Sequence, residues 1–402
     1  MEMSELRALL TPEGLELLDA LGPIEQGADV ARAVSRLRAA GHSPDLVSAV
    51  VGQAALRSRA QAKFGDFAAR MLFTRAGLEQ ATRLGVAARH AQRMRRAGVT
   101  AVADLGCGIG GDSLAFAGAG LDVSAVDADE VTAAIAAYNL APFADSATVA
   151  HGTAQEHAPT ETDGTTAIWM DPARRTAGHG ETRRVSSDDY SPPLDWAFEL
   201  ASRVPSGIKL GPGHDRDALP ADAEAQWVSA EGSVVELVLW TGALAREGVR
   251  RAALVIRGER SHELTAGADA DDAPVRELGA FLHEPDGAVI RARLIGDVAR
   301  SLEAGMLDER IAYLTSDSAL TSPFVQSFRV RETMPANPKA ISAVLKSRRI
   351  GTLEIKKRGM DIDPAAFRKK LALRGDAAAT LILTRVGDQR RAILADRVPA
   401  AG

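Results

Sequence analysis

The pattern of apolar and polar positions divides the chain into a helical beginning and an alternating remainder. Over residues 1–99, apolar residues recur at three- and four-residue spacing, which is typical of amphipathic helices. Thr11-Pro12 and Ser43-Pro44 are helix-starting pairs, and Gly41 and Gly98 are helix-ending residues. We therefore expect a helical N-terminal cap over residues 1–99.

At Val99 the pattern changes to short apolar runs that alternate with helical segments. We expect strands near 99–106, 121–127, 146–152, 165–171 and 206–213. This alternation predicts a mostly parallel α/β sheet with helices on both faces, in a domain over residues 100–257. Two further strand segments lie at 224–242 and 250–258, and their connection is too short for a parallel crossover. We expect these last strands to pair as an antiparallel hairpin.

The C-terminal part contains a second α/β pattern. Residues 258–324 include an acidic loop segment, and we interpret them as a connector with some helix. From residue 325 the order becomes β-α-β-α-β-β, with turn signals such as Asn337-Pro338 and Asp363-Pro364 between the elements. A small α/β domain is therefore expected over residues 325–398.

The composition excludes several classes of protein. One Cys in 402 residues leaves no disulfide framework, Cys-ligated zinc ribbon or iron–sulfur cluster. The eight histidines form no close pair at metal-ligand spacing, so we predict no metal site. No apolar run reaches the roughly 20 residues of a membrane span, and the N-terminus lacks a secretory pattern. We expect a cytoplasmic protein without a membrane partner.

The net charge of −5 conceals a strong asymmetry. Residues 325–402 hold 17 Lys+Arg and 7 Asp+Glu, so this tail is +10 and the remaining chain is −15. A basic α/β module is the electrostatic footprint of a protein that binds a phosphate backbone, and structured RNA is the expected partner. The alternative is a set of solvated charges that balance an acidic neighbour. The candidate RNA-binding residues are Lys346, Arg348, Arg349, Lys356, Lys357, Arg358, Lys369 and Lys370.

The strongest motif follows the first strand, in residues 104–112. Gly106, Gly108 and Gly111 fit a nucleotide-binding fingerprint, in which backbone closely approaches the ligand at a helix start. The glycines alone do not separate NAD from S-adenosylmethionine. Asp104, just before them, suits the methionine ammonium of S-adenosylmethionine and would repel a pyrophosphate. Asp127, about 20 residues on, can accept both ribose hydroxyls.

At these residues the chain resembles the class I S-adenosylmethionine-dependent methyltransferases. The resemblance covers about residues 100–257 and implies a seven-stranded Rossmann-like sheet with an antiparallel last strand. It also implies S-adenosylmethionine as cofactor, lined by Gly106, Gly108 and Gly110 and held at its ribose by Asp127. The family's acid after the third strand is missing, and Gln155 is the candidate that replaces it.

Residues 171–175, Asp-Pro-Ala-Arg-Arg, resemble the catalytic loop of methyltransferases that act on exocyclic amines of bases. The resemblance implies that Asp171 and the Pro172 carbonyl accept hydrogen bonds from the target amine. Ala173 and Arg174 replace the family's Pro and aromatic residue, so Arg174 is expected to hold substrate by stacking or through phosphate. The sole cysteine, Cys107, lies in the glycine loop, which excludes pyrimidine C5 methylation by a cysteine nucleophile.

Two looser resemblances complete the sequence-based hypothesis. The chain is loosely similar to the trimethylguanosine synthase group, in which the segment before the first strand contacts the cofactor; Phe73 and Thr74 occupy that place here. Residues 325–398 resemble the THUMP-like domain, which implies presentation of RNA to a catalytic domain. We expect methyl transfer to a base nitrogen of tRNA or rRNA. The alternatives are a small-molecule or protein methyltransferase, and a non-catalytic RNA-binding protein that retains the cofactor. The sequence leaves the oligomeric state open.

Overall fold

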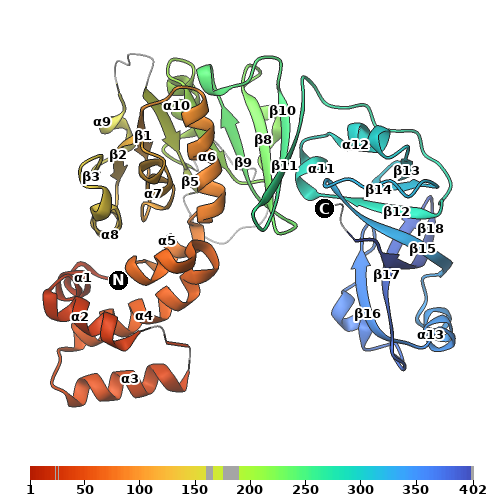
Figure 1. Ribbon diagram of the computed structural model, residues 1–402, viewed down its shortest axis with the longest axis horizontal. Helices are drawn as coiled ribbons and strands as arrows, with labels where there is room; N and C mark the ends of the chain where they lie inside the picture. The colour runs from red at the N-terminus through yellow and green to blue at the C-terminus, as the bar shows by residue number, and fades with distance from the viewer. Residues whose placement is uncertain (23, 26, 160–165, 175–189, 400–402) are drawn as a thin grey trace. The chain divides into compact units, whose positions relative to one another are not determined.

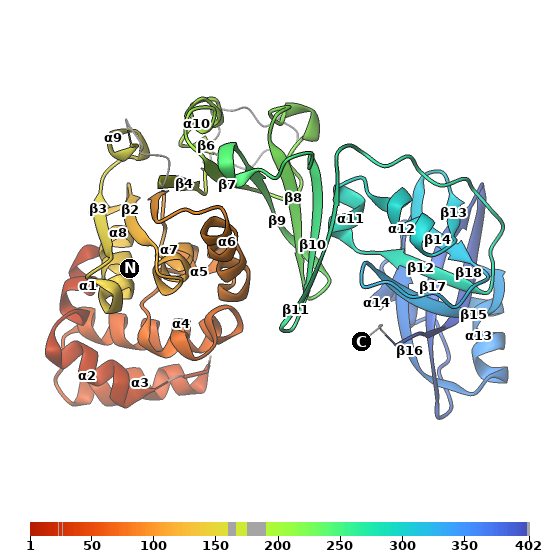
Figure 2. The same cartoon turned by 45° about the horizontal axis from the view of Figure 1, so that its top comes forward.

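The computed structural model describes residues 1–22, 24–25, 27–159, 166–174 and 190–399. The chain forms two compact units, which are described separately (Figures 1 and 2). The first contains residues 1–210, 215–223 and 238–246, and the second contains residues 211–214, 224–237 and 247–402.

The first unit begins with helices, as expected. The elements are α1 (Met3–Leu9), α2 (Pro12–Leu21), α3 (Ala28–Ala39), α4 (Pro44–Phe64), the 3₁₀ helix η1 (Gly65–Arg70), α5 (Arg75–Gln80) and α6 (Leu84–Arg96). Thr11 and Ser43 cap α2 and α4 by accepting from the amides of Gly14 and Leu46. Helix α4 contacts α1, α2 and α3, and its buried residues extend from Leu46 to Phe64, so it forms the centre of this helical layer.

A parallel sheet follows the helices in the first unit. Its strands are β1 (Ala101–Leu105), β2 (Asp122–Asp127), β3 (Ala147–His151), β4 (Thr166–Met170) and β7 (Ser206–Leu210). The pairs β3-β2, β2-β1, β1-β4 and β4-β7 are all parallel. The connecting helices are α7 (Gly111–Gly118), α8 (Glu130–Leu140), the 3₁₀ helix η2 (Ala141–Phe143), α9 (Ala154–His157) and α10 (Leu194–Ala201). The carboxyl ends of these strands therefore lie along one edge of the sheet.

Strand β9 (Ser233–Trp240) belongs to both units. Residues 238–240 lie in the first unit and residues 233–237 in the second, and in the sheet β9 stands between β7 and β8 (Glu224–Ala230). Glu231 and Gly232 form a two-residue turn with positive φ, which makes β9 antiparallel to β8. The strand order β3-β2-β1-β4-β7-β9-β8 is the seven-stranded α/β arrangement that the resemblance implied, and two further strands after β8 bring the sheet to nine.

The expected hairpin between β9 and the strand at 250–258 is wrong. That strand, β10 (Arg251–Arg257), pairs in parallel with β8 and antiparallel with β11 (Arg260–Ala266). Residues 241–250, which include η5 (Gly242–Leu244), are long enough to carry the chain past β8 before β10 begins. The antiparallel neighbour of β9 is therefore β8, the strand that precedes it in the chain.

The second unit also holds a seven-stranded sheet of order β13-β14-β12-β15-β18-β17-β16. Its strands are β12 (Phe281–Pro285), β13 (Gly305–Asp308), β14 (Ile311–Ser316), β15 (Val325–Pro335), β16 (Ile350–Lys357), β17 (Ala377–Val386) and β18 (Gln389–Arg397). Its helices are α11 (Gly287–Arg291), α12 (Ile295–Ser301), α13 (Pro338–Ser347) and α14 (Pro364–Arg368). The β-α-β-α-β-β order after residue 325 is as expected.

Residues 258–324 hold more structure than the expected connector with some helix. Strand β12 pairs antiparallel with β15, so β12, β13 and β14 extend the same sheet as the strands after residue 325. Residues 325–398 are therefore part of a larger sheet.

Candidate active site

The glycine loop connects β1 to α7 in a left-handed conformation. Gly106, Gly108 and Gly110 have φ values of 100°, 55° and 80°, which favour glycine. The amides of Gly106 and Cys107 both donate to the carbonyl of Val126 at 2.9 Å, which fastens the loop to the end of β2. The loop thus places the half-buried backbone of Gly106 and Gly108 at the carboxyl edge of the sheet, where α/β proteins bind ligands. Burial raises the pKa of the Cys107 thiol well above its usual range, which leaves it protonated and unreactive.

Asp104, at the end of β1, is buried, and only one of its two carboxyl oxygens is hydrogen-bonded within the described residues. Its Oδ2 accepts from Ser113 Oγ at 2.5 Å, whereas its Oδ1 has no hydrogen-bond partner among the described residues. Burial, together with the charges of Asp112 and Asp171, raises the pKa of Asp104 to about 8. A buried acceptor without a donor is a place that a ligand's donor group, directly or through water, can satisfy.

Asp127, at the end of β2, is oriented by two backbone amides. Its Oδ2 accepts from the Gly108 amide and its Oδ1 from the Asp129 amide, both at 2.9 Å. The side chain is half-buried, and burial raises its pKa. Each oxygen keeps a further lone pair, so the carboxylate can also accept hydroxyl groups of a ligand beside the loop.

Asp171 and Pro172 follow β4 directly. Leu105 of β1 lies opposite Met170 of β4, so Gly106 and Asp171 are the first residues beyond the paired strands. A Cβ built on Gly106 would lie 3.9 Å from the Asp171 carbonyl oxygen, which places the two loops side by side. The Asp171 side chain is 35% exposed, whereas Pro172 is buried.

The residues after Pro172 are only partly described. Ala173 and Arg174 form β5, which pairs with β6 (Tyr190–Ser191), and of Arg174 only the backbone is placed. Arg175 and the polar residues 176–189 that follow it lie outside the described residues. Tyr190 of β6 is buried.

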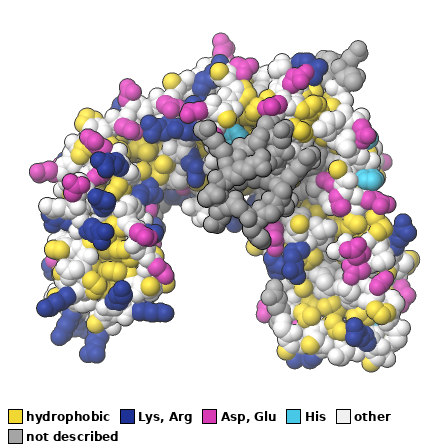
Figure 3. Space-filling model, turned by 180° about the vertical axis from the view of Figure 1, so that it is seen from behind, with side chains coloured by type: hydrophobic (Ala, Val, Ile, Leu, Met, Phe, Trp, Pro, Cys, Tyr) yellow, Lys and Arg dark blue, Asp and Glu magenta, His cyan; other side chains and the backbone are white. Residues whose placement is uncertain are grey.

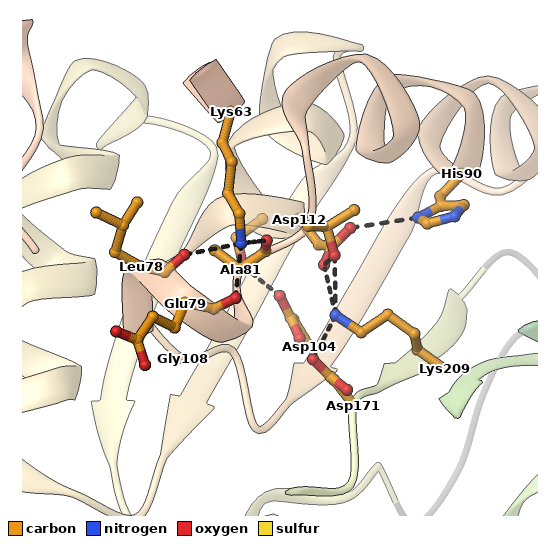
Figure 4. A network of polar contacts seen from close by, with 12 residues as sticks. Lys63, Leu78, Glu79, Ala81, His90, Asp104, Gly108, Asp112, Asp171 and Lys209 are labelled. Atoms are coloured by element: carbon orange, nitrogen blue, oxygen red, sulfur yellow. Dashed lines mark hydrogen bonds and ion pairs between the residues drawn. The ribbon is translucent and has the colours of Figure 1, made fainter. Parts of the chain in front are cut away.

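Sequence reasoning missed Lys209, which the structure places at the centre of the site (Figure 4). Its Nζ lies 2.5 Å from Asp171 Oδ2, donates to Thr82 Oγ1 at 2.8 Å, and is 3.9 Å from Asp112 Oδ2. Asp112 also accepts from Thr82 Oγ1 at 2.8 Å and lies 3.3 Å from His90 Nδ1. Burial alone would raise the pKa of Asp112, but His90, Lys209 and Thr82 together lower it. One signal could have pointed to Lys209: only two of the chain's eight lysines precede residue 339.

The segment before β1 lies against the glycine loop, but Phe73 does not suit the cofactor role expected for it. The Phe73 side chain is fully buried, and Gln53 holds its backbone N–H and C=O at 2.9 and 2.7 Å. Thr74 Oγ1 accepts from the Gly77 amide and caps α5. Asn139 of α8 donates to the carbonyls of Leu72 and Ile109, which joins this segment to the loop.

Gln155 lies on α9, just after β3, with an exposed side chain. This is the place along the chain at which the replacement for the missing acid was expected. No group of three His, Cys, Asp or Glu residues suited to a metal ion occurs within the described ranges.

The candidate RNA-binding residues of the second unit fall into two groups. Lys356 and Arg358 form ion pairs with Glu284 of β12 at 2.7 and 3.6 Å. Arg348 pairs with Glu332 at 2.8 Å, and Arg349 pairs with Asp376 at 3.5 Å. The remaining four candidates are exposed lysines that form no ion pair with another described residue: Lys346, Lys357, Lys369 and Lys370. Basic side chains gather over α13 and the neighbouring strand ends, at the lower left of Figure 3.

Comparisons with known proteins agree with this geometry. A family model described as THUMP domain-like matches residues 325–397, and a domain of unknown function matches residues 2–60. An S-adenosylmethionine-dependent methyltransferase of Mycobacterium tuberculosis, in strains CDC 1551 and H37Rv, is 33% identical over 360 residues, which cover 88% of this chain and 95% of the relative. A crystal structure from Porphyromonas gingivalis W83, assigned as a methyltransferase, is 21% identical with a TM-score of 0.71, over 93% of this chain and 99% of that chain.

These relatives agree with what the site can hold. The left-handed glycines and the buried, unsatisfied Asp104 oxygen fit S-adenosylmethionine, which offers an ammonium group and ribose hydroxyls. Among the described residues, no helix has the length and apolar character needed to cross a membrane.

The 33% identity to the mycobacterial relative over 88% of this chain shows the family. The chain belongs to the S-adenosylmethionine-dependent methyltransferases and carries a C-terminal THUMP-like domain.

Proposed function

We propose that this methyltransferase acts on a base nitrogen of structured RNA, either tRNA or rRNA. The observation that carries the proposal is Asp171-Pro172, a partly exposed carboxylate followed by a buried proline at the carboxyl end of β4, beside the glycine loop. The THUMP-like match and the exposed lysines of the second unit support RNA as the substrate class.

We propose that the glycine loop and its acids hold the cofactor. Gly106, Gly108 and Gly110 allow the backbone to approach it closely, and Asp104 faces its ammonium group. Asp127, already oriented by the Gly108 amide, accepts the ribose hydroxyls. Further contacts are assigned to Gln155 and Thr74. Phe73 is left out because its side chain is fully buried and Gln53 already occupies its backbone N–H and C=O. When bound, S-adenosylmethionine supplies a methyl group already activated as a sulfonium.

The chain's own contribution to the reaction is to position the acceptor. The Asp171 carboxylate and the Pro172 carbonyl accept hydrogen bonds from the acceptor's N–H groups, which directs its lone pair toward the methyl group. Holding the two reacting atoms in line converts a bimolecular encounter into an oriented one, which is worth several kcal/mol of the barrier. Arg174, whose backbone lies in β5, holds the substrate near Asp171.

The proposal is tested by transfer of a radiolabelled methyl group into total RNA from cells that lack this protein. We expect the wild-type chain to label RNA, Asp171→Ala to lose at least about 100-fold in rate, and Asp145→Ala to retain the rate because Asp145 lies on an exposed turn. Cofactor binding measured by calorimetry should survive in both variants. A wild-type chain that binds S-adenosylmethionine but labels protein or small molecules instead of RNA would contradict the proposal.

A further inference from the structure

Lys209 places a buried ammonium group beside Asp171, the residue that we propose binds the methyl acceptor. Its side chain is 10% exposed and lies 2.5 Å from Asp171 Oδ2, whose side chain is 35% exposed. We propose that Lys209 is a positioning residue for methyl transfer, which holds the Asp171 carboxylate in a single orientation toward the acceptor nitrogen. This inference rests on the proposed function, because it concerns the same carboxylate.

The ammonium group is itself fixed from the opposite side. Lys209 donates to Thr82 Oγ1 at 2.8 Å, and Thr82 Oγ1 donates in turn to Asp112 Oδ2 at 2.8 Å. Asp112 is further held by His90, whose ring packs against the Trp169 ring with centroids 4.5 Å apart. A lysine ammonium has three donors. Apart from Asp171, the side chains that face this ammonium group are Thr82 and Asp112, and both are buried and hydrogen-bonded to each other. Lys209 therefore cannot follow Asp171 if that side chain rotates, and it acts as a fixed anchor.

The local charges explain why Asp171 needs such an anchor. Three carboxyl groups, those of Asp104, Asp112 and Asp171, lie close enough to influence one another. Mutual repulsion turns a partly exposed carboxylate toward solvent or favours its neutral form, which donates a hydrogen bond where the acceptor amine needs one accepted. An ammonium at 2.5 Å opposes both effects. It engages Oδ2, and a carboxylate has further lone pairs with which to accept an N–H group.

Lys63 is a natural control for Lys209. It is the other lysine of the first unit and belongs to the same polar network (Figure 4). Its Nζ donates to the carbonyls of Leu78, Glu79 and Ala81 at 2.7–2.8 Å and so closes the end of α5. Lys63 thus has a structural role through backbone, whereas Lys209 contacts acidic side chains, one of them Asp171.

The contact can be tested without any RNA. Lysine-selective isotope labelling gives eight side-chain NMR signals, and Lys209→Arg and Lys63→Arg identify the two of interest. We expect Asp171→Asn to shift the Lys209 signal and to leave the Lys63 signal in place. An unchanged Lys209 signal in Asp171→Asn would overturn the inference.

The consequence for the reaction is tested with radiolabelled transfer into total RNA. We expect Lys209→Gln to lower kcat by about 10- to 100-fold, with the cofactor Kd and the RNA KM changed by less than about threefold. Lys209→Arg, which keeps the charge, should recover part of kcat. The double variant Asp171→Asn/Lys209→Gln should be no slower than Asp171→Asn alone, because the two residues act as one unit.

The outcomes separate this inference from the proposed function. If Asp171→Asn is inactive but Lys209→Gln keeps the wild-type kcat, or if the two effects add fully, Lys209 has no positioning role and the assignment of Asp171 stands. If Asp171→Asn keeps the wild-type kcat, or no RNA is labelled, the proposed function fails, and the NMR comparison still decides the contact. Melting temperature and kcat are measured for both Lys209→Gln and Lys63→Gln. If the two variants lose melting temperature equally and lose kcat equally, Lys209 has a structural role only.

Discussion

Asp104 and Asp112 are buried carboxyl groups of the same site whose pKa values move in opposite directions. Asp112 is surrounded by Thr82, His90 and Lys209, and these partners outweigh burial and lower its pKa. Around Asp104, burial and the charges of Asp112 and Asp171 outweigh the Ser113 hydroxyl and the charge of Lys209, and its pKa rises to about 8. The carboxylate of Asp104 therefore destabilises the folded chain, and it lies at the place assigned to the cofactor's ammonium group. A residue that costs stability in this way is expected at a binding site.

Replacing Asp104 by Asn should stabilise the cofactor-free protein. The unfolded chain loses the Asp104 proton near pH 3.8, whereas the folded chain keeps it to about pH 8, so wild-type stability falls as pH rises between these values. Asn cannot ionise and so removes this loss. The free energy of unfolding of Asp104→Asn should therefore exceed that of the wild type by an amount that grows by up to about 1.4 kcal/mol per pH unit and levels off above pH 8. Urea unfolding across pH 4–9 measures it, with the exposed Asp122→Asn as control. Parallel pH dependences for wild type and Asp104→Asn would show that Asp104 is ionised in the folded state.

The contrast between Asp171 and Lys209 shows how far the sequence could identify the site. Asp104, the glycines, Asp127 and Asp171 stand at the ends of successive apolar runs, and parallel strands bring such ends to one edge. Lys209 stands inside its run, in Ser-Gly-Ile-Lys-Leu, where it looks like an isolated charge in a strand. Its partner is decided by the order of β4 and β7 in the sheet, which no local pattern contains.

At the scale of elements, Gly207 of β7 leaves the space in which two aromatic rings from the neighbouring strands β4 and β9 meet. A Cβ at Gly207 would lie 2.6 Å from the Trp169 ring and 2.8 Å from the Trp240 ring, and these rings are themselves 5.8 Å apart. Gly207 and Lys209 are two residues apart on a strand and so point to the same face. The tight packing at Gly207 therefore sets the position of Lys209.

Gly207→Ala should destabilise the first unit and slow the reaction. The added methyl group has no space, so we expect a loss of about 1–3 kcal/mol in the free energy of unfolding and a lower kcat through the displaced Lys209. Gly211→Ala is the matched control, because a Cβ there meets nothing within 4 Å. Equal stability of the two variants, measured by urea unfolding, would refute the account of this packing.

Helix and strand positions could be read from the sequence more readily than strand pairing could. The elements after residue 325 follow regular apolar spacing, and all six occur in the expected order. The expected hairpin between β9 and β10 was wrong because β10 pairs with β8 instead. The partner of β10 depends on which strand of the sheet has an unpaired edge, and this is a property of the whole sheet. Strand β12 was missed because its buried centre is polar: His283 lies between the hydroxyls of Ser327 and Ser316, and burial lowers its pKa to about 4, which keeps it neutral.

At the scale of the whole molecule, the basic character of the C-terminal region is smaller than the sequence suggested. Residues 325–402, with a net charge of +10, supply only four strands of the seven-stranded sheet. Residues 258–324 supply the other three strands and contain 13 acidic and 6 basic residues. Glu284 alone pairs with two of the candidate RNA-binding cations. The surface that we expect to contact phosphate therefore reduces to the exposed lysines without ion pairs.

Those lysines should account for the salt dependence of RNA binding. We expect the quadruple variant of Lys346, Lys357, Lys369 and Lys370 to Gln to weaken binding and to reduce the slope of log affinity against log salt by about 0.7–0.9 for each phosphate that is no longer neutralised. Arg348→Gln/Arg349→Gln, which removes paired cations, should change the slope less per charge. Titrations of structured RNA at several salt concentrations provide the comparison. Equal effects per charge in both variants would mean that overall charge, and not these lysines, governs binding.

The central claim is that methyl transfer goes to a base nitrogen of RNA. Its most direct test is mass-spectrometric identification of the nucleoside that the wild-type chain methylates in RNA from cells lacking this protein, with Asp171→Ala beside it. The account predicts a nucleoside with the new methyl group on a base nitrogen, absent from the Asp171→Ala reaction. A methyl group on the ribose or on a base carbon, or an equal yield from Asp171→Ala, would contradict it.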